Sequence, residues 1–143
     1  MAETTTLPTE IRLDIVTPDH LVAHDAVTSV SIPGKNGYLG ILPGHAPLLT
    51  EIAPGGLEYT SGGTRHSLAV NWGFAEVLPD RVIVLAQTAE RAEEIDVGRA
   101  ERAKTRAEER LKRFGDPAVD MDRAREALRR ALARLETAHK LRD

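Results

Sequence analysis

The stretch GKNGYLGILPGHAPLL, residues 34–49, decides the fold of this 143-residue chain. Glycine stands at positions 34, 37, 40 and 44, and proline stands at positions 43 and 47. Glycine permits positive φ and close approach of the backbone, whereas proline fixes φ near −65° and removes a hydrogen-bond donor. Such a segment is incompatible with the interior of a helix. It predicts a hairpin tip, a short strand over residues 38–42 and a rigid turn on a β framework.

Around this stretch, apolar residues alternate with polar ones in short runs that are separated by turns rich in glycine and proline. These runs predict strands at residues 11–15, 22–27, 30–32, 48–52, 57–60, 65–70, 72–78 and 81–86. The residues of the quoted stretch that we expect to fill the core are Leu39, Ile41, Leu48 and Leu49. Short strands without a helical period are typical of a small antiparallel β-sandwich or flattened barrel.

After Glu90 the apolar period becomes helical. One stripe is Ala100, Ala103, Ala107, Leu111 and Phe114, and a second is Ala124, Leu128, Ala131, Leu135 and Ala138. We expect the first helix to begin near Asp96 and to end at residues 115–117, where glycine and proline occur. Asp120 or Asp122 is expected to cap the second helix. The two helices would form an antiparallel αα-hairpin.

The sequence therefore predicts an α+β fold, with a β-sandwich at residues 1–88 followed by an αα-hairpin at residues 89–143. The charge changes at the same boundary: residues 1–88 hold four Lys/Arg and nine Asp/Glu (net −5), and residues 89–143 hold fifteen and thirteen (net +2), which sum to −3. The facing stripes of the helices are mostly alanine, and a buried methyl contributes only about 0.8 kcal/mol. Composition alone fits both a hairpin that opens and one that stays packed.

Composition also narrows the function. A net charge of −3 argues against a general nucleic-acid binder. The chain has no cysteine, so it has neither a disulfide framework nor a thiolate metal site. No apolar run approaches the ~20 residues that a membrane-spanning helix needs, and the N-terminus lacks a secretory pattern. We expect a soluble, cytoplasmic protein.

No catalytic motif is present: the sequence contains no HExxH, no GxSxG and no Walker GxxxxGK[ST]. Of the five histidines, only His45 lies in a special place, inside the rigid turn, where a structural or interface role is favoured over a catalytic one. We expect no catalytic residue, no metal site and no enzyme activity of the chain by itself.

The arginines of the helical part leave two interpretations open. Arg99, Arg102 and Arg106 lie on one side of the first helix, and Arg130 and Arg134 lie one turn apart on the second. Guanidinium groups match phosphate geometry, so they could converge on a polyphosphate. Alternatively they form a solvated face balanced by neighbouring glutamates, with ion pairs worth only tenths of a kcal/mol.

Several motifs identify the chain by resemblance. They are GYLGILPGHAPLLT (37–50), GFAEV (73–77), VLAQTAE (84–90) and IDVGRA (95–100). In this order and with this spacing they resemble the ε subunit of bacterial F-type ATP synthase over nearly the whole chain. The resemblance implies a rotor subunit of the central stalk, whose sandwich binds the γ subunit and sits on the c-ring. It would help couple proton-driven rotation to ATP synthesis on other subunits.

The resemblance also implies interface residues. Asn36, Gly37 and Tyr38 would touch the polar loops of the c-ring, and His45 would approach γ. The family often has an acid at the place of Tyr38, so a charge pair with the ring is in doubt. When the hairpin extends along γ into the head of α and β subunits, it would block ATP hydrolysis. The basic residues that would meet acidic surface of β are Arg123, Arg125, Arg129, Arg130 and Arg134.

The segment IDVGRA resembles the I/LDxxRA pattern with which some bacterial ε subunits bind ATP. The site implied by this resemblance comprises Glu90, Ile95, Asp96, Arg99, Ala100, Arg106, Arg130 and Arg134. ATP would act as a regulatory ligand that favours the compact hairpin, and no cofactor is required. Gly98 departs from the usual helix former inside the motif.

By the same resemblance, the protein would lie at the cytoplasmic face of the cell membrane and touch the membrane only through the complex, without nucleic acid as a partner. Two other classes stay open. One is a stand-alone nucleotide-binding or interaction module, and the other is a nucleic-acid binder that uses the arginine-rich hairpin. The nearly matched charges and the lack of interleaved aromatic residues argue against the second.

Overall fold

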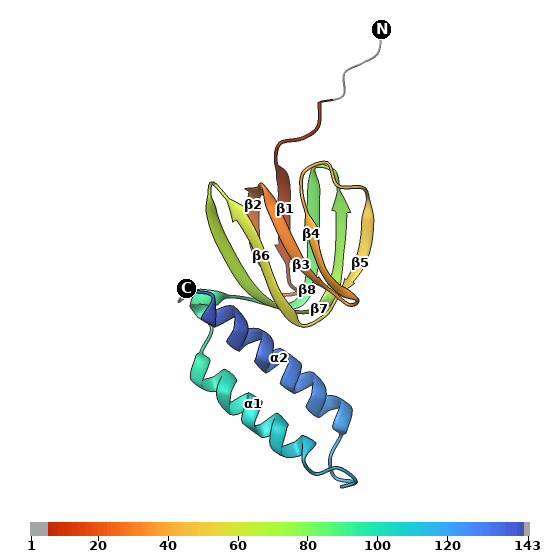
Figure 1. The fold of residues 1–143 in the computed structure, drawn as a ribbon, viewed down its shortest axis with the longest axis vertical. Coiled ribbons are helices and arrows are strands. Elements are labelled where there is room, and N and C mark those ends of the chain that lie inside the picture. Colours follow the sequence, from red (N-terminus) through yellow and green to blue (C-terminus); the bar gives the residue numbers. More distant parts are fainter. Residues whose placement is uncertain (1–5, 142–143) are drawn as a thin grey trace.

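Strands and helices occupy separate halves of the chain in the computed structural model, which describes residues 6–141 (Figure 1). The strands are β1 (Ile11–Val16), β2 (Leu21–Val27), β3 (Ser29–Gly34), β4 (Gly37–Ile41), β5 (Leu48–Ile52), β6 (Gly55–Ser61), β7 (Thr64–Leu78) and β8 (Arg81–Arg91). A 3₁₀ turn (Ala92–Glu94) leads into α1 (Val97–Leu111) and α2 (Met121–His139). The predicted order of a β-sandwich followed by a helical hairpin is confirmed. Residues 1–5 and 142–143 of the two predicted ranges lie outside the described residues.

Strand β7 corrects the prediction of separate strands at residues 65–70 and 72–78. It is continuous because its first half pairs with β6 (Gly56↔Ala69) and its second half pairs with β5 (Thr50↔Ala75). Between the two halves lies Gly73, where a Cβ atom would lie 1.8 Å from the carbonyl oxygen of Leu85, so a larger residue does not fit there. Strand β7 thus belongs to both layers of the sandwich.

The strand order is β2-β1-β8-β7-β5-β3-β4, with β6 pairing with β3 and β7. Within the described residues, the pairing is antiparallel except between β1 and β8, which run parallel (Leu13↔Val82). Strand β8 continues beyond Thr88, where the charge composition changes, as far as Arg91. Glu90 therefore lies on a strand.

The core of the sandwich consists of aliphatic side chains, many of them inaccessible to solvent, such as Leu13, Leu57 and Leu68. Ile41 is buried and Leu39 packs against the core, as predicted. Leu48 and Leu49 are 36% and 70% exposed, so their predicted place in the core was wrong. The buried residue of β5 is Ile52. Leu49 lies on the opposite, outer face, whereas Leu48 shares the face of Ile52 but stands at the exposed start of the strand.

Both helix starts follow the predicted capping chemistry. The backbone N–H of Arg99 donates to Asp96 (3.0 Å), and that of Arg123 donates to Asp120 (3.1 Å). The end of α1 does not agree: the helix stops at Leu111 rather than at residues 115–117, so Phe114 is 85% exposed instead of lying in the seam. The seam itself contains buried alanines, namely Ala100, Ala107, Ala124 and Ala131. None of the described helices is long and apolar enough to cross a membrane.

Candidate functional site

Helix α2 packs against the end of the sandwich formed by β6 and β7 (Figure 1). On this side it buries Ala133 and Thr137, which the single predicted stripe of α2 had missed. Ala138 joins a small apolar cluster with Ala69 and Ile95. The excess of small residues on a second face of the helix was the sequence feature that could have predicted this second buried face. We call this surface, between α2 and strands β6–β8, the docking interface.

Polar pairs hold the docking interface along the length of α2. The indole Nε1–H of Trp72 donates to Glu126 Oε2 (2.6 Å), and the guanidinium of Arg129 lies 5.3 Å from the centroid of the Trp72 ring. At the far end, Lys140 pairs with Glu58. The hydrogen bond from Lys140 to Glu58 raises the pKa of that lysine above its ordinary value.

The docking interface also contains part of the predicted nucleotide site. Arg134 Nε donates to Glu90 Oε2 (3.0 Å), and Arg130 lines the same small cavity between α2, β7 and β8. The centre of a water molecule can occupy only about 10 Å³ there, which is room for about one water. No described residue of α1 lines this cavity.

The remaining residues of the predicted nucleotide site lie apart from that cavity. Asp96 caps α1, and Ile95 and Ala100 are buried in the apolar cluster and the helix seam. Arg99 and Arg106 are exposed on α1. The structure therefore brings Glu90, Arg130 and Arg134 together, and leaves the two arginines of α1 facing solvent.

The predicted interface residues of the sandwich lie at its two opposite ends (Figure 1). The turn with Asn36 and Gly37 is exposed near α2, and the hydroxyl of the half-exposed Tyr38 accepts a hydrogen bond from the N–H of Gly56 (3.3 Å). His45 is half-buried in the loop at the other end, where the neighbouring Gly44 N–H donates to Pro79 O (2.8 Å).

The basic residues of α2 divide into two groups. Arg123, Arg125 and Arg129 are exposed, and Arg125 pairs only with Asp122 of its own helix (2.9 Å) among the described residues. Arg130 and Arg134 are half-buried on the side of the sandwich. A partner that approaches the outer surface of the docked hairpin can reach Arg123 and Arg125 directly, whereas Arg129 also contacts the Trp72 ring at the docking interface.

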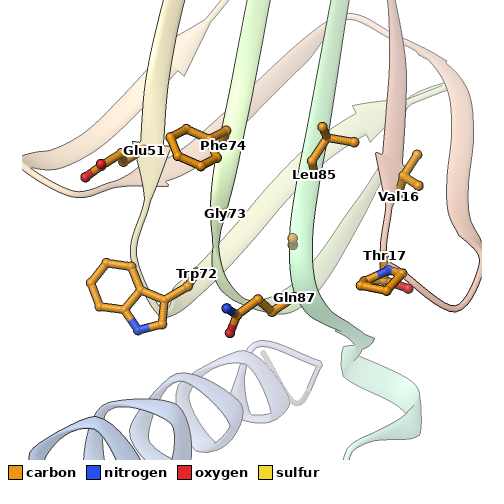
Figure 2. A pocket seen from close by; sticks show the side chains of 10 residues that line it. Val16, Thr17, Glu51, Trp72, Gly73, Phe74, Leu85 and Gln87 are labelled. Atoms are coloured by element: carbon orange, nitrogen blue, oxygen red, sulfur yellow. The ribbon is translucent and has the colours of Figure 1, made fainter.

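Sequence reasoning missed an apolar groove on the outer face of β1, β8, β7 and β5 (Figure 2). The strand register aligns Val16 with Leu85 and Leu85 with Phe74, so these side chains form one row across the sheet. Phe74 and Leu85 are each 53% exposed, and the groove has a volume of about 640 Å³ with Trp72 at the end that faces α2. The run VIVLA (82–86) was the available indication, because it is apolar on both faces of its strand.

Metal binding and acid–base chemistry find little support in the part of the chain that the structure describes. It contains no group of three or more His, Asp or Glu side chains that could hold a metal ion. His66 stacks on Tyr59, with ring centroids 4.8 Å apart. Tyr59 donates to Asp25 (2.8 Å) and accepts from Arg91, and burial raises the pKa of the Tyr59 phenol. This network ties β8 to the rest of the sandwich.

Two family models match the sequence. "ATP synthase, Delta/Epsilon chain, beta-sandwich domain" matches residues 10–92, and "ATP synthase, Delta/Epsilon chain, long alpha-helix domain" matches residues 93–139. The ATP synthase epsilon chain of Koribacter versatilis is 61% identical over 104 residues, which are 73% of each chain. That of Nitratidesulfovibrio vulgaris (strain DP4) is 50% identical over 125 residues, 87% of this chain and 92% of the relative.

Solved structures agree with the sequence matches. A chain in the cryo-EM structure of Euglena gracilis mitochondrial ATP synthase (OSCP/F1/c-ring, rotational state 1) is 27% identical, with a TM-score of 0.83, and the match covers 96% of this chain and 87% of that one. A chain in the central stalk/c-ring structure of Tetrahymena thermophila mitochondrial ATP synthase is 12% identical, with a TM-score of 0.55 and coverages of 96% and 100%. The second likeness concerns the fold alone.

Proposed function

This chain belongs to the family of bacterial ATP synthase epsilon chains and is a non-catalytic subunit, and from that premise we propose that it couples rotation of the c-ring to ATP synthesis and restrains ATP hydrolysis. The sandwich is the part that binds the rotor, and the helical hairpin is the part that regulates. The protein acts at the cytoplasmic face of the membrane, which it touches only through the complex. The proton is the coupling ion in this proposal.

The observation that carries the rotor role is the apolar groove. Phe74 and Leu85 are large, half-exposed side chains in one row, and the exposed Leu49 lies on the same face of the neighbouring strand β5. Phe74 and Leu85 would each gain about 1 kcal/mol on being covered. A contiguous apolar surface of this kind marks a protein interface. We assign this face to the γ subunit, and His45 to the rim of the same contact.

The γ assignment is tested by co-purification. Phe74→Asp and Leu85→Asp each place a charge in the contact and should abolish retention on immobilised γ. Thr64→Asp is the matched control, because Thr64 is the exposed first residue of β7 and does not line the groove. Undiminished retention of both groove variants would reject this face as the γ contact.

The c-ring contact is assigned to the hairpin tip with Asn36, Gly37 and Tyr38. The tip is exposed and polar, and Gly37 adopts a φ of 130°, a conformation that favours glycine. Tyr38 offers an aromatic ring with a polar end, which suits a contact with polar loops. Cross-linking from a photoreactive residue at position 36 should label the c subunit. Labelling of γ alone would overturn this assignment.

Inhibition of hydrolysis is assigned to the hairpin. The seam between α1 and α2 is built from alanine, and the docking interface combines small apolar residues with polar pairs, so separation of the helices from the sandwich exposes few large apolar side chains. The exposed Arg123, Arg125 and Arg129 would then meet acidic surface of β, joined by Arg130 and Arg134 once α2 leaves the sandwich.

The inhibition assignment is tested with the reconstituted catalytic head. Full-length protein should lower its ATPase activity more than a variant truncated after Ala92. That site is chosen because β8 extends to Arg91, whose guanidinium hydrogen-bonds Tyr59, and because Ala92 is itself buried. Equal activities with both proteins would remove the inhibitory role.

ATP is proposed as the ligand that stabilises the compact hairpin. The supporting features are the IDVGRA segment and the convergence of Arg130 and Arg134 near Glu90. Since the present cavity holds about one water, ATP must displace Glu90 from Arg134 or approach from the exposed arginines of α1. Calorimetric titration of the isolated protein with MgATP should show binding that Arg134→Ala weakens. Nucleotide binding without any γ association would favour a stand-alone nucleotide-binding module instead.

A further inference from the structure

The chain has a single tryptophan, and it belongs to two sites at once. Trp72 lines the apolar groove together with Phe74 and Leu85, and its indole N–H donates to Glu126 on α2. Figure 2 shows the indole at the end of the groove, on the side where α2 passes beneath the sandwich. One side chain therefore forms part of the proposed γ contact and part of the docking interface.

Pairing fixes the backbone on both sides of Trp72, and α2 supplies the hydrogen bond and the cation contact of its side chain. The β7–β8 pairing holds Asn71 opposite Thr88 and Gly73 opposite Ala86, and it skips Trp72 between them. Gly73 also approaches β8 too closely for any larger residue. The orienting contacts of the indole come from the hydrogen bond to Glu126 and from Arg129, which itself pairs with Glu126 (3.4 Å).

We propose that Trp72 couples the docking of α2 to the binding of γ, so that each favours the other. This inference rests on the proposed γ contact in the groove. While α2 is docked, Glu126 and Arg129 hold the indole in place as a wall of the groove. When α2 leaves, the indole loses both contacts and becomes free to adopt other rotamers. The binding of γ must then order the indole as well, and this entropy cost lowers the affinity of the chain for γ. By reciprocity, γ seated in the groove holds the indole ready for α2 and favours the compact hairpin.

The test measures the affinity of purified γ for the full-length chain, with no α or β subunit present. Glu126→Ala should weaken γ binding about fivefold or more, although Glu126 does not line the groove. Glu126→Gln keeps an oxygen acceptor for the indole N–H and should restore most of the affinity. Asp122→Ala is the matched control on an exposed part of the same helix and should leave binding unchanged. An unchanged affinity of Glu126→Ala would overturn the coupling.

A double-mutant cycle separates this route from a direct contact between Glu126 and γ. Trp72→Phe keeps an apolar ring but has no N–H donor, so adding Glu126→Ala to it should cause no further loss. A full additional fivefold loss in that background would overturn the role of Trp72. If Phe74→Asp abolishes γ binding while Glu126→Ala does not change it, the γ contact stands and only the coupling fails. If Phe74→Asp also leaves binding unchanged, both proposals fail.

Discussion

The sandwich and the docked hairpin are stabilised by different physical means. The sandwich encloses large aliphatic side chains such as Leu57 and Leu68, and it buries Tyr59 with its hydroxyl satisfied by Asp25 and Arg91. The hairpin meets the sandwich through alanine, threonine and ion pairs, and Thr137 Oγ1 is buried there without a hydrogen-bond partner among the described residues.

This difference teaches where the molecule can move. Apolar burial contributes about 1.5–3 kcal/mol for a large side chain and about 0.8 kcal/mol for a methyl group. Half-exposed ion pairs contribute about 0–1 kcal/mol each. Local opening free energies follow such differences in packing, so the hairpin is the part that separates first while the sandwich stays folded. The proposed rotor-binding role requires a sandwich that stays folded, and the proposed regulatory role requires a hairpin that can separate.

The largest expected effect comes from breaking the core of the sandwich. Leu68→Ala removes a fully buried side chain and leaves a cavity, and it should lower the free energy of unfolding by about 2–5 kcal/mol. Urea unfolding followed by circular dichroism measures this. Leu132→Ala is the control, because Leu132 on α2 is 43% exposed and should change stability by no more than about 0.5 kcal/mol. Similar losses in both variants would contradict the contrast between the two regions.

The next largest effect concerns Gly73, the neighbour of Trp72 in β7. Gly73→Ala places a Cβ atom against the carbonyl oxygen of Leu85, so the backbone of β7 and β8 must separate there. Such forced shifts cost about 1–3 kcal/mol. A shift of this backbone also displaces Trp72, whose indole N–H donates to Glu126 on α2. Hydrogen exchange in α2 should therefore accelerate along with the loss of overall stability. Gly40→Ala, on an exposed strand where a Cβ meets nothing within 4 Å, should do neither.

A third substitution should stabilise the docking interface. Thr137→Val keeps the shape of the side chain and removes a buried hydroxyl that has no partner among residues 6–141. An unsatisfied buried polar group costs about 1–3 kcal/mol. The free energy of local opening of α2, measured by hydrogen exchange, should therefore rise by about 1 kcal/mol. Urea unfolding of the sandwich should stay unchanged, and so should the protection of α2 in Thr105→Val, on the exposed face of α1. Lower protection in Thr137→Val would show that the hydroxyl is satisfied in solution.

Local chemistry made much of the fold predictable. Asp96 identified the start of α1, Asp120 was one of two residues predicted to cap α2, and β5 was predicted with its observed bounds. Long-range pairing was not predictable. The continuity of β7 depends on β8 lying alongside Asn71 and Gly73, and the exposure of Leu49 depends on which face of β5 meets the core.

The candidate site shows the same division. The sequence placed Arg130 and Arg134 on one side of a helix, which the structure agrees with, but the pairing of Arg134 with Glu90 joins residues 44 positions apart. The apolar groove joins β1, β5, β7 and β8, so no local pattern contains it. The available indication was the run VIVLA (82–86) of β8, which is apolar on both faces of its strand and so places apolar side chains on the outer face as well.

The smallest expected effect is a pH dependence at the end of α2. The pKa of Lys140 is raised above its ordinary value of 10.5, mainly by the hydrogen bond to Glu58. The charged lysine therefore stabilises the docked hairpin fully below pH 10.5, and this contribution is lost as the pH rises through the raised pKa. Since the pair is partly solvated, the loss should amount to only a few tenths of a kcal/mol.

That measurement requires a control, because Tyr59 titrates in the same window. Burial raises the pKa of the Tyr59 phenol above its ordinary value of 10.0, so the sandwich also loses stability in alkali, with the same sign. Lys140→Gln removes only the contribution of the docking interface. Hydrogen exchange is measured between about pH 9 and 11.5 and corrected for intrinsic exchange rates. In the last turn of α2, the corrected exchange should depend on pH more steeply in the wild type than in Lys140→Gln. In β6 and β7 the two proteins should respond alike. Identical profiles in α2 would mean that the Lys140–Glu58 pair contributes nothing to docking. The polar contribution to docking would then come from the Glu90–Arg134 pair and from the contacts of Trp72 with α2.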